Sequence, residues 1–349
     1  REKHDQLCAD DHGPDVSSAR SDRREAVNRR AILLLLGVFG LLKALPLWAS
    51  PYAISLATLF LFFAYAGQAW NIMMGFAGLL SLGHALYLGV GAYTVAALYD
   101  HFTIGPWLGL WVALALCGSL AAALAALAFR YRVSGVYFAL LTIACAEFAR
   151  IGFDHFTWVG GSGGLFLKVV ESDRLDLLNL RGPPAMFYYL MLFLTGAALL
   201  LSALLLRSRA GYYWQAIRED EDAAAALGVN TFRWKMLAVI ISGAMTALAG
   251  MFSAFYYSNL FPEQLFHISR SIEIILGPML GGIGTLFGPI IGAALLTVLS
   301  EGATEFVAAL GWDVPGVKQL VYGVVLFAIV GFMPQGVWPA LARKLRLAK

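Results

Sequence analysis

The chain has little charge for its length. Only 13% of its 349 residues are Asp, Glu, Lys or Arg, whereas soluble domains carry about 25%. Hydrophobic residues make up 60% of the chain, and the mean hydropathy is +0.72. This balance excludes an ordinary soluble domain and indicates an integral membrane protein. The net charge of +3 comes from cations in a few polar segments, so it indicates no nucleic-acid partner.

Sequence signatures of catalysis and metal binding are missing. The three cysteines (Cys8, Cys117, Cys145) lie too far apart in the sequence to indicate a disulfide framework or a metal cluster. No G-x-x-x-x-G-K-[ST] occurs, and neither does H-E-x-x-H nor G-x-S-x-G. We therefore expect no catalytic residue, no metal ligand and no cofactor site on this chain, and no ATP site of its own.

Long uncharged runs predict an all-α polytopic membrane protein embedded in the lipid bilayer. Each run is long enough to cross a bilayer as a helix. The predicted full crossings, about eight in number, lie at 31–49, 54–73, 78–99, 107–129, 134–153, 185–206, 236–257 and 316–333. The domain prediction is a polar, disordered cytoplasmic tail at 1–30, a transmembrane domain at 31–335 that contains the polar loop 207–235, and a basic cytoplasmic tail at 336–349.

A further uncharged run, Ile274–Ser300, does not fit one crossing. As a single helix it would span about 40 Å, more than the roughly 30 Å of a bilayer core. Repeated Gly and Pro residues interrupt it, and they predict a broken re-entrant pair hinged near Gly281–Gly284. If this pair enters and leaves the membrane on the same side, most Lys and Arg residues of the chain lie on one side of the bilayer. We therefore expect about ten segments in all, with both termini cytoplasmic.

Polar residues at membrane depth mark a second broken place, residues 71–93. Asn71, Ser81, His84 and the later Thr142 are functional-site candidates because polar groups are rare there. The alternative is hydrogen bonding between helices, with glycines that allow close packing. For His84 we favour packing over contact with a solute.

Two polar loops carry open alternatives. Residues 207–235 hold five cations and a helix-prone stretch that Gly228 ends, so the loop is either a cytoplasmic docking surface or a solvated connector. The glycine run 160–164 in the outside loop 154–184 is a backbone nest or a flexible linker, and its spacing favours the linker. Glu147 and Arg150, three residues apart on one helix, predict a local ion pair without a transport role.

Four stretches form ordered motifs within residues 50–335: NIMMGFAGLLSLGHALYLGVGAY at 71–93, GVYFALLT at 135–142, AIREDEDAAAALG at 216–228 and GGIGTLFGPIIGA at 281–293. In this order they resemble branched-chain amino acid ABC transporter permeases of the LivM type. The first is similar to the N-x-x-x-G-[YF]-x-G-x-x-S-L-G-H-x-x-[FY]-x-x-x-G-A-Y signature of that family. The sequence departs from the family pattern at residues 66–70 and at Trp158-Val159, before the glycine run.

The resemblance implies an inner-membrane subunit of a binding-protein-dependent bacterial importer. Its implied partners are a second, LivH-like permease, two ATP-binding subunits that hold ATP and Mg, and a periplasmic solute-binding protein. The implied pathway residues are Asn71, Ser81, His84, Tyr137, Thr142, Gly282 and Gly284. The implied ATPase-coupling residues are Ala216, Arg218, Glu219, Glu221, Ala224 and Gly228.

Two other functions stay open. An ion-coupled secondary transporter would need acidic residues in mid-membrane, and the runs 107–129, 185–206 and 236–257 contain none. A membrane enzyme would need a nucleophile, base or metal set that the sequence does not display. Within the importer class, the solute is an amino acid, urea or an amide.

Overall fold

The computed structural model describes residues 40, 42–167, 176–309, 316–333 and 336–344. Two compact units divide the chain: residues 1–48 with 341–349, and residues 49–340. In the first unit, the short 3₁₀ helix η1 spans Leu45–Leu47. The predicted tail at 1–30 and most of the predicted crossing at 31–49 lie outside the described residues. All elements below belong to the second unit, except that the last helix crosses its boundary.

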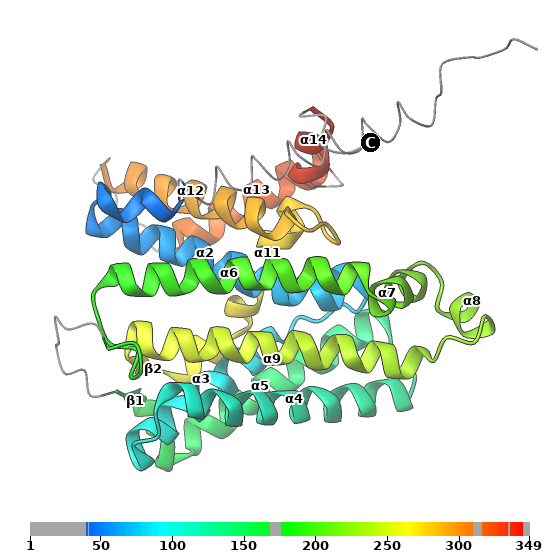
Figure 1. The fold of residues 1–349 in the computed structure, drawn as a ribbon, viewed down its shortest axis with the longest axis horizontal. Coiled ribbons are helices and arrows are strands. Elements are labelled where there is room, and N and C mark those ends of the chain that lie inside the picture. The colour runs from blue at the N-terminus through cyan, green and yellow to red at the C-terminus, as the bar shows by residue number, and fades with distance from the viewer. Residues whose placement is uncertain (1–39, 41, 168–175, 310–315, 334–335, 345–349) are drawn as a thin grey trace, which may run out of the picture. The chain divides into compact units, whose positions relative to one another are not determined.

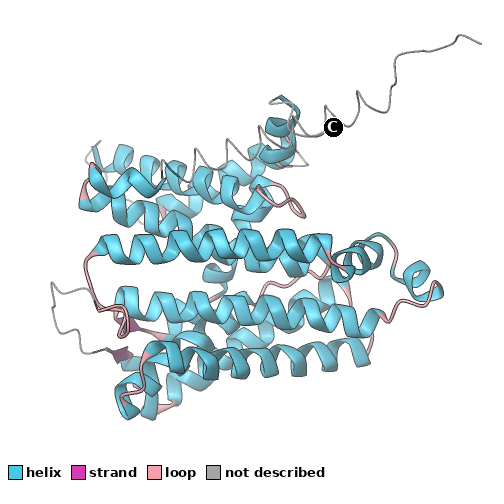
Figure 2. Ribbon diagram, in the orientation of Figure 1, coloured by secondary structure: helices cyan, strands magenta, loops and turns pink. Residues whose placement is uncertain are grey.

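Helices dominate the 49–340 unit (Figure 1, Figure 2). The helices are α2 Pro51–Asn71, its π-helical continuation η2 Ile72–Phe76, α3 His84–Phe102, α4 Pro106–Arg130, α5 Gly135–His155, η3 Thr157–Val159, η4 Gly161–Gly163, α6 Pro184–Arg207, α7 Arg209–Glu219, α8 Glu221–Ala226, α9 Thr231–Tyr257, α10 Pro262–Phe266, α11 Ile268–Gly281, α12 Gly288–Ala309, α13 Val317–Phe332 and α14 Val337–Lys344. The only strands among the described residues are β1 Leu165–Phe166 and β2 Asn259–Leu260.

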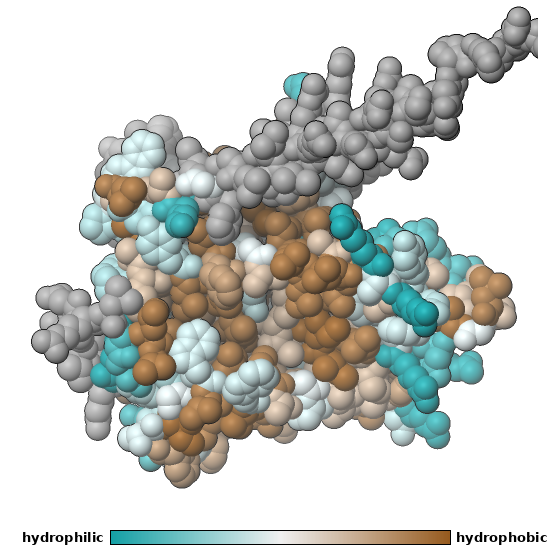
Figure 3. Space-filling view, viewed as in Figure 1, coloured by the Kyte–Doolittle hydropathy of each residue, from teal (hydrophilic) through white to brown (hydrophobic). Residues whose placement is uncertain are grey.

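Five helices of the described part are long and apolar enough to cross a membrane. They are α2 with η2, α4, α5, α6 and α9, which confirms helices at the predicted crossings 54–73, 107–129, 134–153, 185–206 and 236–257. Large apolar side chains such as Leu108, Phe148 and Phe193 are exposed on their outer faces, as lipid contact requires. Figure 3 shows apolar residues over the middle of one face and hydrophilic residues around α7 and α8.

The predicted crossing at 78–99 is wrong at its start, because α3 begins only at His84. Gly78 has φ +72°, outside the helical region, and the chain from 77 to 83 is not helical. Backbone groups of this stretch find side-chain partners instead. The Leu82 N–H donates to Thr142 Oγ1 at 3.1 Å, and the Trp70 indole donates to the Ser81 carbonyl at 2.8 Å. Irregular backbone at membrane depth is tolerated only when it is satisfied in this way.

The break near Gly281–Gly284 is confirmed, since α11 and α12 are antiparallel neighbours joined by residues 282–287. A Cβ at Gly281 would lie 1.7 Å from the carbonyl oxygen of Gly288, so only glycine allows this close approach. The expectation of two short segments is wrong for α12, which has 22 residues and continues past Ser300 through Glu301 and Glu305. The predicted boundary was placed at Ser300 because the charged Glu301 follows it. A charged residue does not end a helix whose backbone hydrogen bonds continue. The predicted crossing at 316–333 is the 16-residue helix α13.

The glycine run 160–164 is not a plain linker. It forms 3₁₀ turns, with Gly160, Gly161 and Gly164 at positive φ, and leads directly into β1. β1 pairs antiparallel with β2, with Leu165 opposite Leu260. The run is thereby fixed to the end of α9, opposite the end that leads to α8 (Figure 1).

Candidate functional site

The charged segment 207–235 folds into two short helices and the first turns of α9. The helix-prone stretch before Gly228 is not one continuous helix, because the chain breaks at Asp220 between α7 and α8. The Asp220 carboxylate caps α8 by accepting from the N–H groups of Asp222 (3.0 Å) and Ala223 (2.9 Å), because a capping side chain satisfies the free donors of a first turn. As expected, Gly228 lies just beyond the helix at φ +87°.

Side chains on α9 hold both short helices in place. The Lys235 ammonium lies 2.8 and 2.9 Å from the two carboxylate oxygens of Glu221, and 4.5 Å from the ring centre of Phe129. Its side chain is only 8% exposed, so this ion pair is largely shielded from water. The buried Trp214 of α7 donates to the Trp234 carbonyl at 2.7 Å. α7 and α8 are therefore attached to the membrane helix that follows them.

The six predicted coupling residues divide between surface and interior. Glu221 faces Lys235, and Ala224 is buried. Glu219 has a side chain that is 77% exposed, and Ala216, Arg218 and Gly228 also reach the surface. These surface residues, and the partly exposed Glu221, can meet another protein directly, whereas Ala224 cannot.

Arg218 connects α7 to the two broken membrane segments. Its guanidinium donates to the carbonyl oxygen of Gly75 in the π turn η2. The Asn71 side chain accepts from the Gly284 N–H at 2.8 Å and donates to the Thr285 carbonyl at 2.9 Å. We call this set (residues 71–76, residues 282–287 and Arg218) the junction. The junction joins both helix breaks and the polar loop in one hydrogen-bonded group.

Glycine is required at position 284 of the junction. Its φ is +77°, and a Cβ there would lie 2.5 Å from Arg218 Nη1. The neighbouring Gly282, at φ +124°, is buried and accepts from the Thr285 hydroxyl at 2.7 Å. Gly282 and Gly284 therefore set the shape of the turn at 282–287, which lies beside the Arg218 guanidinium.

Ser81 and His84 belong to a second, fully buried cluster. His84 Nε2 lies 2.8 Å from Ser242 Oγ, and that hydroxyl donates to the Ala69 carbonyl at 2.7 Å. A serine has one proton to donate, so Ser242 accepts from His84 Nε2–H. His84 Nδ1 lies 3.3 Å from Ser81 Oγ. An imidazole with a serine partner at each nitrogen holds α3 to α9, and this geometry favours the packing interpretation.

Thr142 and Tyr137, both on α5, lie in different environments. Thr142 is buried, and its hydroxyl donates to the Ala139 carbonyl at 2.7 Å while accepting from Leu82 N–H. Tyr137 is 75% exposed and joins neither the cluster nor the junction. The seven predicted pathway residues therefore do not meet at one place.

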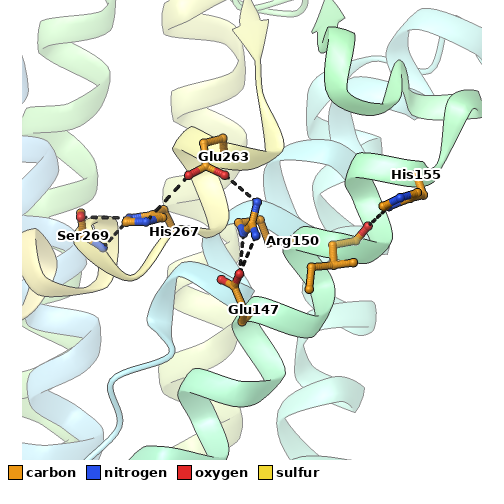
Figure 4. A network of polar contacts seen from close by, with 7 residues as sticks. Glu147, Arg150, His155, Glu263, His267 and Ser269 are labelled. Atoms are coloured by element: carbon orange, nitrogen blue, oxygen red, sulfur yellow. Dashed lines mark hydrogen bonds and ion pairs between the residues drawn. The ribbon is translucent and has the colours of Figure 1, made fainter.

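The predicted ion pair of Glu147 and Arg150 is present at 2.6 Å, and it is part of a larger network (Figure 4). Arg150 also lies 2.6 Å from Glu263, whose other oxygen is 3.8 Å from His267. The network links α5 to α10. Glu263 and His267 were missed because their link to α5 depends on tertiary folding.

Several other polar side chains were missed for the same reason. They are Gln68, Ser242 and Ser271, each of which hydrogen-bonds a segment far away in the sequence. Lys235 was identified only as one of the five cations of the polar loop, although its position directly before an uncharged run was a usable signal.

The profile of the family described as "Branched-chain amino acid transport system / permease component" matches residues 52–330. The chain is 30% identical to the high-affinity branched-chain amino acid transport system permease protein LivM of Escherichia coli K12 over 338 residues, which cover 90% of this chain and 76% of LivM. LivM of Salmonella typhimurium is similar to the same extent. LivH of Salmonella typhimurium is 29% identical over 130 residues, 37% of this chain and 40% of LivH. No solved structure matches the chain.

The matched range includes the junction, the buried cluster and both short helices of the polar loop. The likeness to LivM covers 90% of the chain, whereas the likeness to LivH covers 37% of it. The helical spans and these relatives make the chain a multi-pass protein of the inner membrane. It belongs to the branched-chain amino acid transport permease family, as a member of the LivM type.

Proposed function

We propose that this chain is the membrane-spanning permease subunit of a binding-protein-dependent ABC importer for branched-chain or related amino acids. A second, LivH-like permease completes the translocation path. Two partner subunits bind ATP and Mg, and a periplasmic protein delivers the solute. The family supports this assignment, as do the relatives named as branched-chain amino acid permeases.

The observation that carries the proposal is the contact of Arg218 with Gly75. ATP-driven closure of the partner subunits displaces α7 and α8, whose surface residues Glu219 and Gly228 face outward. Through Lys235 the movement reaches α9, and through Arg218 it reaches the turn at 282–287. The two helix breaks then change their packing and alternate access to the path.

The orientation follows from the same proposal. Residues 207–235 face the cytoplasm, where ATP is, and so do both termini, including the tails at 1–30 and 336–349. The end with β1, β2 and the Arg150 network faces the binding protein. Excess Lys and Arg in the inward segments supports this orientation.

Affinity purification in mild detergent, followed by mass spectrometry, tests the proposal. We expect a tagged chain to recover an ATP-binding subunit and a second permease. Scrambling 217–228 should remove the ATP-binding subunit, while scrambling the exposed outer turn 177–179 should not. Recovery of the chain alone, with ion-driven and ATP-independent uptake in liposomes, would instead establish a secondary transporter. Binding-protein assays with leucine, urea and acetamide separate the amino acid from the urea or amide alternative.

A further inference from the structure

Two neighbouring cavities lie away from the junction and share Arg270 and Tyr257. One, of about 260 Å³, is lined by side chains that include Asn259, Gln264 and Ser253, beside the last turn of α9. The other, of about 190 Å³, lies between α2, α11, α12 and α13. Both volumes are below the roughly 300–1,000 Å³ of sites for drug-sized ligands, and they suit a small solute.

Charges of both signs line the 190 Å³ cavity. Arg270 Nη1 lies 2.8 Å from the Glu273 carboxylate, and Glu301 of α12 lines the same space. Apolar side chains, among them Leu59, Phe63 and Leu296, line the same cavity. A guanidinium with five N–H donors can bind a second carboxylate while it keeps its bond to Glu273.

The charged residues line a cavity beside a helix that can span the membrane. Leu59 and Phe63, which line the same cavity, belong to the interior of α2, which is long and apolar enough for such a span. Glu301 is about 20 Å along α12 from its start at Gly288, where the chain leaves the junction turn. Ionisable side chains at such depth are rare, and they are functional candidates by default.

Helix stability does not explain the position of Arg270. It occupies the first turn of α11, where the helix dipole is positive and a cation is unfavourable. Glu273 offsets this cost, yet an apolar pair at these two positions would need no such compensation. An anion bound in the cavity would be stabilised both by Arg270 and by the helix terminus.

We propose that these cavities bind the solute as a zwitterionic aliphatic α-amino acid. Arg270 holds its carboxylate, Glu301 and Glu273 hold its ammonium group, and Leu59 and Phe63 contact its side chain. The proposal deepens the proposed importer function and rests on it. Urea and simple amides carry no net charges for Arg270 and Glu301 to pair with, so the site disfavours them.

The first test is photolabelling of the wild-type complex, purified through a tag on this chain. The probe is photo-leucine, a diazirine analogue of leucine, with excess leucine as competitor. We expect leucine-protected labels on residues 257–260, 59–63 or 293–301, mapped by mass spectrometry. Labels confined to other segments would overturn the site assignment.

The second test assigns each charged residue to one charged group of the solute. It measures how well leucine, and analogues that lack one of its charged groups, compete with photo-leucine labelling. Arg270→Gln should abolish the preference for leucine over isopentylamine, which lacks the carboxylate. Glu301→Gln should abolish the preference over 4-methyl-2-oxopentanoate, which lacks the ammonium group. In each case we expect at least a tenfold loss of preference. The controls Arg130→Gln and Asp222→Asn, which alter exposed charges elsewhere, should leave both preferences intact.

The outcomes distinguish failure of the proposed binding site from failure of the proposed importer function. ATP-driven leucine uptake by the wild type, combined with unaltered preferences in Arg270→Gln and Glu301→Gln, would overturn the site and keep the importer. Absence of ATP-driven uptake of any amino acid by the wild-type complex would overturn both. If the variants fail to assemble, the wild-type labelling pattern still decides the site.

Discussion

Arg218 of α7 donates a hydrogen bond to the main-chain carbonyl of Gly75, 143 residues earlier in the chain. The acceptor lies in a π turn, where the regular backbone hydrogen bonding of α2 has changed register. A charged side chain of the polar loop therefore holds an irregular turn of a membrane helix. The contact gives the loop a direct mechanical connection to the broken segments.

Replacing Arg218 by Ala should uncouple ATP hydrolysis from transport. A hydrogen bond to a charged group contributes about 1.5–3 kcal/mol, equivalent to roughly tenfold or more in a coupled equilibrium. We expect uptake to fall by about that factor while basal ATP hydrolysis continues. Arg233→Ala, which removes an exposed cation from the same loop, is the matched control. Solute-stimulated hydrolysis and uptake, measured in proteoliposomes, would both remain normal in Arg218→Ala if the contact were incidental.

Replacing Gly284 by Ala should destabilise the junction. An L-residue at φ +77° costs about 1–3 kcal/mol, and the new Cβ would also press on Arg218. Thermal unfolding in detergent should therefore begin a few degrees lower. Gly302→Ala in α12 is the control, because nothing lies within 4 Å of its Cβ position and alanine favours a helix. Equal melting curves for the two variants would show that the turn has room for a side chain.

Exchanging the charges of Glu221 and Lys235 tests how α8 is held. Glu221→Lys places two cations together at a shielded site, and breaking a buried pair costs up to about 3–5 kcal/mol, less here because Glu221 is partly exposed. We expect α8 to detach, which limited proteolysis at 220–230 would detect. The double variant Glu221→Lys with Lys235→Glu should restore protection. Protection in the single variant would mean that the pair does not anchor α8.

Replacing His84 by Ala should affect stability more than transport. The change removes the hydrogen bonds of His84 to Ser81 and Ser242 and opens a space in a fully buried site, for a cost of about 2–5 kcal/mol. Uptake per folded complex should remain close to that of the wild type. Normal folding with abolished uptake would instead assign His84 to the solute pathway.

Sequence patterns identified the helices well because their signal is local. Apolar runs located α2, α4, α5, α6 and α9 to within a few residues. Helix ends were harder to predict. The helix predicted from residue 78 starts later because Gly78 is not helical, and α12 continues through Glu301. Hydropathy alone predicts neither result.

The junction illustrates what the sequence could not show. Asn71, Arg218 and Gly284 were each chosen as candidates, but their hydrogen bonds join positions up to 214 residues apart. Such pairing depends on how the helices pack. The role of Arg270 was equally hidden, since its placement beside α2 and α12 comes from the hairpin formed by α11 and α12.

ATP-driven uptake is the most direct test of the coupling account. The complex purified through this chain would be reconstituted with its binding protein, and leucine uptake measured with ATP, without ATP and with an ion gradient alone. The account predicts uptake only with ATP, and its loss in Arg218→Ala but not in Arg233→Ala. Uptake driven by an ion gradient without ATP, and unaffected by Arg218→Ala, would contradict it.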